Sequence, residues 1–196
     1  TLSGLCREKD CLLIADEVQT GFGRTGNLFA YESVGLVPDM VTLAKPLAGG
    51  LPLAAVLLPE KLQELLKPGD HGSTFGGGPV QSAVALEVIN ILSAPSFLEE
   101  TKKKGDLLFK ELSGLAEKCS IAEGVRGKGI LLGISIKTEG ETPPQIAEII
   151  TRAREKGLLI LRSGDNVIRI APPLIIKEQE IREGVAILEE ILNSFA

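Results

Sequence analysis

Short apolar runs alternate with polar and glycine-rich segments through the first half of the chain. Three runs have the length of strands, at residues 12–15, 40–44 and 53–58. The first is apolar on both faces, which is typical of a central strand in a parallel sheet. A glycine-rich loop follows at 72–78, and Pro79 then opens an alanine-rich helix that reaches about Leu92. This half of the chain therefore predicts an α/β sheet domain.

The second half changes to longer amphipathic segments. A charged run at 99–104 begins a helix whose apolar positions recur near the 3.6-residue helical period, at Leu107, Leu108, Leu112 and Leu115. Beyond Gly124 the pattern predicts a strand at 130–136, a helix at 144–156, short strands at 158–161 and 167–170, and a final helix at 177–194. We therefore expect a second, smaller α/β unit to begin near Ser120.

Composition and charge narrow the class of protein. Of the 196 residues, 44% are hydrophobic and 24% are charged, which excludes wholesale disorder. The net charge of -5 argues against a broad nucleic-acid face. The longest apolar runs fall far short of the roughly 20 residues that span a bilayer. No basic and apolar leader is visible, so we expect a soluble, cytoplasmic protein, and the first residue, Thr1, suggests that a preceding segment has been removed.

The chain has few histidine and cysteine side chains that could bind a metal or act as a nucleophile. His71 is the one histidine, so a histidine-based metal site or a Ser-His-Asp triad is nearly excluded unless His71 serves alone. Cys6, Cys11 and Cys119 lack the close paired spacing of a zinc site and are expected to be buried small hydrophobic residues. We predict no metal. Catalysis must therefore come from Lys, Arg, Asp or Glu side chains, or from a cofactor.

Two charged side chains directly follow apolar runs. Asp16 ends the first and Lys45 the second, and ligands of open α/β sheets gather at the carboxyl ends of strands. A partly desolvated lysine there would act as a neutral nucleophile. Alternatively, Asp16 caps the following turn and Lys45 merely reaches solvent. The small neighbours Ala44 and Pro46, with a Gly-Gly pair close behind, leave room for a ligand and favour a site.

The glycine-rich loop at 72–78 offers backbone N–H groups, the hydroxyls of Ser73 and Thr74, and the dipole of the following helix. These groups suit an anion such as phosphate. No Lys-Ser/Thr pair follows the glycines, so this is not a Walker loop. A flexible loop without a ligand stays the alternative.

Four segments together resemble the class III pyridoxal-phosphate aminotransferases, and most closely the acetylornithine aminotransferases: LIADEVQTGFGRTG at 13–26, TLAKPLAGG at 42–50, HGSTFGG at 71–77 and VIRIAPPL at 167–174. The resemblance runs through the whole chain and implies an α/β fold-type-I PLP-dependent transferase. Residues 1–95 would be the later part of the large PLP-binding domain with its mostly parallel sheet, 96–119 a connecting helix and 120–196 the small C-terminal domain.

The resemblance also implies roles for the candidate residues. Lys45 would form the Schiff base with pyridoxal 5'-phosphate and then shuttle a proton, while Asp16 would pair with the pyridine nitrogen. The remaining cofactor contacts would come from Val18 on a ring face, Gln19 at the ring hydroxyl, and Ser73 and Thr74 at the phosphate. Arg169 would grip the substrate α-carboxylate, unless it is a surface arginine on an edge strand.

The reaction implied is transfer of the amino group of N-acetylornithine to 2-oxoglutarate, in arginine biosynthesis, by a homodimer in which the Thr74 loop crosses the interface. No nucleic-acid or membrane partner is expected. The alternatives are an ornithine, 4-aminobutyrate or succinyl-diaminopimelate donor, a mutase or decarboxylase of the same class, and a cofactor-free module. A cofactor-free lysine aldolase is disfavoured, because it has no pyridine for Asp16 to hold.

Two departures from the family pattern stand out. Gly78 precedes Pro79 where the family has Asn. The chain also opens just before the Asp16 strand, so the sequence resembles the C-terminal part of such an enzyme. The second phosphate-binding loop and the aromatic residue on the other ring face are therefore expected upstream.

Overall fold

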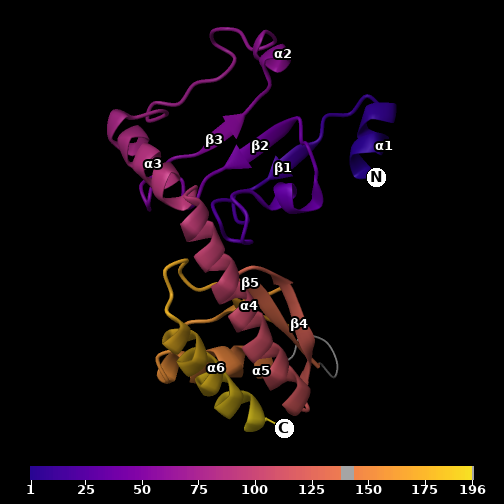
Figure 1. The fold of residues 1–196 in the computed structure, drawn as a ribbon, viewed down its shortest axis with the longest axis vertical. Coiled ribbons are helices and arrows are strands. Elements are labelled where there is room, and N and C mark those ends of the chain that lie inside the picture. The colour runs from indigo at the N-terminus through magenta and orange to yellow at the C-terminus, as the bar shows by residue number, and fades with distance from the viewer. Residues whose placement is uncertain (138–143, 196) are drawn as a thin grey trace. The chain divides into compact units, whose positions relative to one another are not determined.

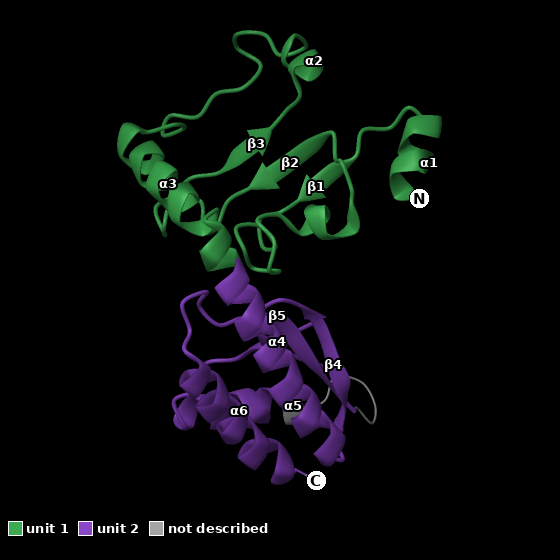
Figure 2. Cartoon of the chain, viewed as in Figure 1, with its two compact units in different colours: residues 1–98 green, residues 99–196 purple. Residues whose placement is uncertain are grey.

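The computed structural model describes residues 1–137 and 144–195 (Figure 1). It divides into two compact units, residues 1–98 and 99–196 (Figure 2). The first unit opens with helix α1 (Leu2–Glu8), whose first turn is capped by the hydroxyl of Thr1. The domain boundaries 1–95, 96–119 and 120–196 were inferred from the resemblance to the family, and they stay a prediction.

A three-stranded sheet of order β1-β2-β3 forms the centre of the first unit. Strand β1 (Ile14–Asp16) runs parallel to β2 (Met40–Leu43), and β3 (Ala55–Leu57) runs antiparallel to β2 on its other side. The parallel pairing expected for β1 is confirmed, but its central position is wrong. Strand β1 lies at the sheet edge, where no described strand covers its other side, so Ile14 stays 54% exposed despite its apolar character.

Helix α3 (Pro79–Leu92) occupies the predicted range, with Pro79 in its first turn. Two further elements, the 3₁₀ helix η1 (Ala30–Val34) and helix α2 (Glu60–Gln63), were not predicted. Both are shorter than two helical turns, so they carry no hydrophobic period. A small core joins the strands to α3 through Phe22, Val41, Leu43, Leu47, Ala48 and Ala85.

The second unit contains a four-stranded sheet of order β4-β5-β7-β6 in which every pairing is antiparallel. Its strands are β4 (Ala122–Lys128), β5 (Leu131–Ile136), β6 (Leu161–Ser163) and β7 (Val167–Ile170). Strand β4 was not predicted, because it is a largely exposed edge strand whose glycines and basic residues break the apolar pattern. Strand β6 begins at Leu161, where the predicted strand ended.

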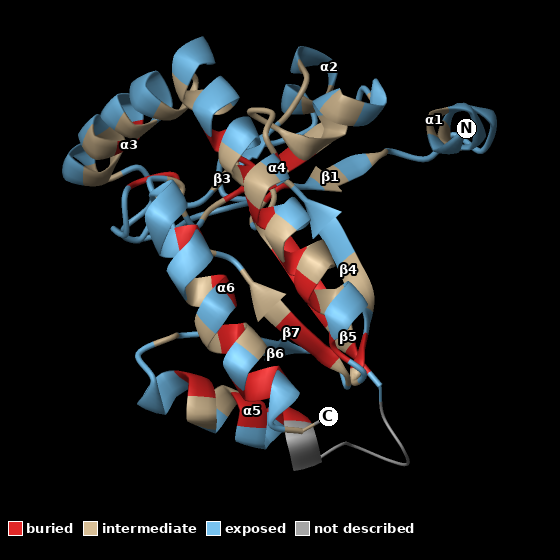
Figure 3. Ribbon diagram, turned by 60° about the horizontal axis from the view of Figure 1, so that its bottom comes forward, coloured by how far each residue is buried: buried red, intermediate tan, exposed pale blue. Residues whose placement is uncertain are grey.

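Three helices complete this unit, namely α4 (Pro95–Lys118), α5 (Pro144–Glu155) and α6 (Glu178–Asn193). The helical period predicted for α4 is confirmed, since Leu108, Leu112 and Leu115 are at most 3% exposed. They join buried residues of β5, β7, α5 and α6 in one continuous core (Figure 3). The core of the second unit therefore draws on α4 as well as on the residues beyond Ser120.

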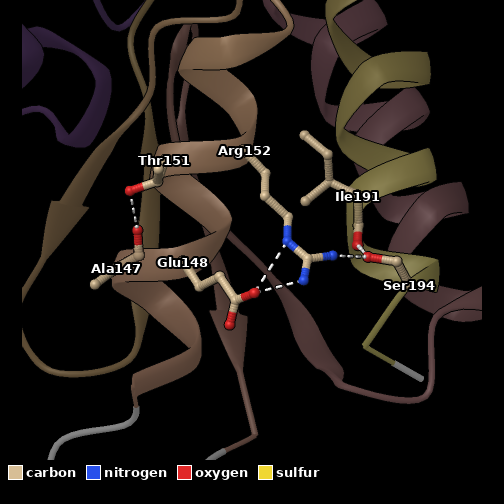
Figure 4. A network of polar contacts seen from close by, with 6 residues as sticks. All are labelled: Ala147, Glu148, Thr151, Arg152, Ile191 and Ser194. Carbon is tan, nitrogen blue, oxygen red and sulfur yellow. Dashed lines mark hydrogen bonds and ion pairs between the residues drawn. The ribbon is translucent and has the colours of Figure 1, made fainter.

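A polar cluster ties α5 to the end of α6 (Figure 4). The Arg152 guanidinium donates to Glu148 one turn back and, through Nη1, to Oγ of Ser194 at 2.9 Å. Ser194 in turn donates to the carbonyl of Ile191 at 2.6 Å. The guanidinium also lies 4.4 Å from the ring centroid of Phe195, a cation–π contact. One arginine thus fixes the C-terminal turn of α6 against α5.

The cysteine expectation is only partly met. Cys119 is buried, but Cys6 is half-buried because it lies in the small helix α1, which has no buried residue, and Cys11 is exposed in the segment after that helix. Among the described residues, no group of three or more His, Cys, Asp or Glu side chains would hold a metal ion.

No single described helix is both long enough and apolar enough to span a membrane. Helices α3 and α4 reach that length and apolar character only as a pair, which is bent at the break between Leu92 and Pro95.

Two glycines of α4 give a matched stability test. A Cβ at Gly105 would lie 2.7 Å from the carbonyl carbon of Gly129, whereas a Cβ at Gly114 would meet nothing within 4 Å. We expect Gly105→Ala to destabilise the chain by about 1–3 kcal/mol, because backbone must move. Gly114→Ala should stabilise it by about 0.5–1 kcal/mol. Urea denaturation measures both, and equal midpoints for the two variants would contradict this packing.

Candidate active site

Asp16 ends β1 in an exposed position, and its carboxylate accepts two hydrogen bonds. The backbone N–H of Val18 and the hydroxyl of Thr42 both donate to its Oδ1, each at 3.1 Å. Thr42 is also the residue paired with Asp16 across the parallel strands. Asp16 therefore does cap the following turn, as one interpretation of the sequence held. That bond does not compete with a ligand role, because the bonds from Val18 and Thr42 end on the same carboxylate oxygen, Oδ1.

Lys45 follows β2 in an unusual backbone conformation. Its φ is +22°, in the left-handed region, although the residue carries a Cβ and precedes Pro46. The buried residues Leu43 and Leu47 anchor the chain on both sides, and Leu47 N–H donates to Ala44 at 2.8 Å. The lysine itself is exposed. Such backbone strain persists only where the surroundings impose it, and it concentrates at functional sites.

The register of the sheet brings Asp16 and Lys45 to the carboxyl ends of two neighbouring strands. Because β1 and β2 are parallel and Asp16 is level with Thr42, both strands deliver their carboxyl ends to the same side of the sheet. A carboxylate and an amine are thus presented from neighbouring strand ends. The roles that the sequence suggested for them stay predictions.

The other predicted cofactor contacts divide into two groups. Val18 and Gln19 lie in the turn that directly follows Asp16, where Val18 is half-buried and Gln19 is exposed. Ser73 and Thr74 lie in an exposed loop that leads into α3, and Phe75 beside them is 83% exposed. No hydrogen bond or ion pair joins these two hydroxyl residues to Asp16 or Lys45 within the described ranges.

Arg169 belongs to the second unit. It lies on β7, which is flanked by β5 and β6, and it is paired with Gly133 on one side and Leu161 on the other. The residue is half-buried and its Nε is buried. The interpretation of Arg169 as an edge-strand surface arginine is therefore wrong, because β7 is an inner strand.

Sequence reasoning missed two residues that shape the Asp16 end of the sheet. Thr42 bonds the Asp16 carboxylate across the strands. Glu17 is only 3% exposed and accepts hydrogen bonds from both the Thr20 hydroxyl and the Tyr31 backbone. A second acid directly after an apolar strand was the available signal for Glu17, since an acid in that position has to be either solvated or hydrogen-bonded.

Comparison with known proteins identifies the family. The family described as Aminotransferase class-III matches residues 1–192. The chain belongs to the class-III aminotransferases, and the predicted α/β fold of the PLP-dependent transferases is confirmed.

Particular relatives are similar along nearly the whole chain. The acetylornithine aminotransferase of Caldanaerobacter subterraneus is 45% identical over 96% of this chain and 47% of its own length. The crystal structure of acetylornithine aminotransferase from Elizabethkingia anophelis has a TM-score of 0.89 at 39% identity, covering 98% of this chain and 48% of that one. For an ornithine aminotransferase from Plasmodium yoelii the TM-score is 0.91 at 34% identity, covering 100% and 51%. The chain thus spans about half the length of these relatives.

A charged contact of the Asp39 carboxylate holds the start of the β1–β2 pair, and low pH should weaken it. Oδ2 of Asp39 accepts the backbone N–H of Leu13 at 2.9 Å, and Oδ1 lies 3.4 Å from Nζ of Lys61. The Leu13 N–H lowers the pKa of Asp39 below its usual range, and Lys61 and Arg7 add to that effect. The ionised carboxylate therefore stabilises the fold above the ordinary aspartate pKa of about 3.9.

We expect wild-type protein to be more stable than Asp39→Asn at pH 7. The difference should shrink as the pH falls below about 3.9 and through the lowered pKa of the folded state. Urea denaturation at a series of pH values measures this. A difference that does not change with pH would show that the charge of Asp39 contributes nothing.

Proposed function

We propose that the protein, with pyridoxal 5'-phosphate bound, transfers the amino group of N-acetylornithine to 2-oxoglutarate, as a cytoplasmic enzyme of arginine biosynthesis. The observation that carries the proposal is the pair Asp16 and Lys45, presented from neighbouring parallel strand ends in a class-III aminotransferase chain. The choice of donor is supported by the relatives named acetylornithine aminotransferase, at 38–45% identity.

The residues at this edge fit the cofactor by their chemistry. An acid whose Oδ1 is fixed by two donors suits a protonated ring nitrogen, and an exposed lysine suits an aldehyde. When bound, pyridoxal phosphate supplies an electron sink for the carbon that carries the amino group. Around the ring, Val18 would pack on a face and Gln19 would bond the hydroxyl. Ser73 and Thr74 would hold the phosphate.

Each protein group then has a defined task. Asp16 would keep a proton on the ring nitrogen by its negative charge. Lys45 would attach the cofactor and, once displaced, its Nζ would carry a proton from the substrate carbon that loses the amino group to the cofactor. Arg169 binds the substrate α-carboxylate with two parallel hydrogen bonds, for which a planar guanidinium is suited.

A homodimer is part of the proposal. Helix α3 carries one charged residue, Glu87, yet only Ala85 is buried in this chain. Val80 and Leu86 are 64% and 66% exposed, and Phe75 in the preceding loop is exposed too. A second copy of the chain, packed on α3, would cover this apolar surface and would bring the Thr74 loop across the interface.

A second donor deserves a direct comparison. Ornithine is favoured by the structural similarity to the Plasmodium yoelii ornithine aminotransferase. Donors such as 4-aminobutyrate and succinyl-diaminopimelate are supported only by membership of the class. Relative kcat/KM values for these four amines, measured with 2-oxoglutarate, separate the candidates.

The proposal predicts a cofactor-dependent transamination that requires Lys45. We expect the full-length protein to form glutamate from N-acetylornithine and 2-oxoglutarate, and to show a visible absorption band with pyridoxal phosphate. Lys45→Ala should lose the band and the activity, whereas Lys67→Ala, which alters another exposed lysine of the same unit, should keep both. A wild-type protein without the band would favour the cofactor-free module instead.

Arg169 gives an independent test of substrate binding. We expect Arg169→Gln to raise the KM for N-acetylornithine about tenfold or more, because a charged two-pronged contact is lost. The matched control is Arg162→Gln, on the neighbouring strand β6, where the guanidinium bonds its own loop at Gly164 and Asp165. Steady-state kinetics measure both variants, and an equal effect of the two would contradict the role given to Arg169.

A further inference from the structure

Glu17 is a buried carboxylate beside the proposed cofactor-binding acid. It follows Asp16 directly, but it is 3% exposed whereas Asp16 is exposed. Its Oε2 accepts the Thr20 hydroxyl at 2.5 Å and its Oε1 accepts the Tyr31 backbone N–H at 3.0 Å. A carboxylate is costly to bury without such donors. The structure supplies one donor from the turn after β1 and one from η1.

The backbone of Glu17 makes two further bonds. Its N–H donates to the carbonyl of Thr42 on β2, and its carbonyl accepts the N–H of Gly21, each at 3.0 Å. One residue therefore joins the end of β1, the strand β2, the turn at 17–21 and the 3₁₀ helix η1. Displacing Glu17 would release all of these attachments together.

The turn that Glu17 closes has little freedom. A Cβ at Gly21 would lie 2.9 Å from the Glu17 carbonyl oxygen, so a side chain there would collide with backbone. The next residue, Phe22, is 2% exposed with φ +57°, and its ring meets Phe29 at 5.8 Å between centroids. Phe29 stacks on Tyr31 at 5.5 Å. The aromatic cluster and the carboxylate thus hold the same turn from two directions.

The neighbourhood of Tyr31 agrees with this arrangement. Burial raises the pKa of Tyr31, and the negative charges of Glu32 and Glu17 raise it further. Glu32 is the contrasting acid, because it is exposed and only caps η1 through the Phe29 N–H at 3.3 Å. Two acids therefore bond the same short helix, and only Glu17 also bonds the turn.

We propose that Glu17 is a positioning residue for the cofactor site. By holding Thr20 and Tyr31, it fixes the turn that presents the Val18 N–H to Oδ1 of Asp16, and so sets the direction of the Asp16 carboxylate. Glu17 itself does not touch the cofactor. This inference rests on the proposed function, because it assigns Glu17 a task at the same site.

The test compares three variants of the full-length protein. Glu17→Ala removes both side-chain bonds. Glu17→Gln keeps an acceptor for the Tyr31 N–H and offers an amide to the Thr20 hydroxyl, so it should rescue the geometry. Glu32→Ala is the matched control, since it removes an exposed acid from the same 3₁₀ helix. Pyridoxal phosphate is the probe, titrated by its visible absorption.

We expect Glu17→Ala to raise the dissociation constant of pyridoxal phosphate about tenfold or more and to move the absorption maximum of the bound cofactor. Glu17→Gln should stay close to wild type in both, and Glu32→Ala should change neither. Amide hydrogen exchange at Tyr31 and Gly21 should speed up in Glu17→Ala alone. These results would separate a positioning role from a general loss of stability.

The milder variant Thr20→Val covers the case in which Glu17→Ala does not fold. It keeps the side-chain shape but removes the hydroxyl donor to Glu17, so cofactor affinity should fall by about two- to fivefold. If Glu17→Ala folds and binds pyridoxal phosphate as tightly as wild type does, the inference is overturned and the proposed function stays intact. If Glu17→Ala does not fold, the same result in Thr20→Val overturns the inference. Absence of cofactor binding by wild type would overturn the proposed function and the inference with it.

Discussion

The parallel pairing of β1 with β2 is the constraint on which the candidate site depends. Strand β1 has only three residues, too few for its own ladder to fix the register firmly. Side-chain contacts hold it at both ends instead. Asp39 bonds Leu13 where the pair begins, and Thr42 bonds Asp16 where it finishes. A slip of one residue would turn Asp16 to the other face of the sheet.

The two units solve different structural problems. The second unit packs an antiparallel sheet against amphipathic helices, and many of its core residues are fully buried. Its strand order places Arg169 on the inner strand β7. The first unit has a small core, and its specific polar and aromatic contacts lie mainly at the loops after β1 and β2. Left-handed backbone at Phe22 and Lys45, together with the buried acid Glu17, gives those loops defined shapes. The conformation of those loops therefore rests on specific contacts more than on buried area.

Sequence patterns predicted the features that depend on period and on backbone chemistry. Pro79 marked the start of α3, and the leucine spacing predicted the buried side of α4. The apolar runs before Asp16 and Lys45 predicted that these residues follow the carboxyl ends of neighbouring strands. Features set by tertiary neighbours were not accessible in that way. Strand β4 has no apolar alternation, and the hydrogen bonds of Glu17 come from residues 3 and 14 positions away in the chain. The edge position of β1 likewise depends on which strands surround it.

The most direct test of the central claim is to locate the covalent attachment of the cofactor. Full-length protein incubated with pyridoxal phosphate, reduced with borohydride and digested would be mapped by mass spectrometry. The account predicts a pyridoxyl group on Lys45 at near-complete occupancy, and a marked loss of labelling in Asp16→Asn. Labelling spread over exposed lysines, with Lys45 unmodified, would contradict it.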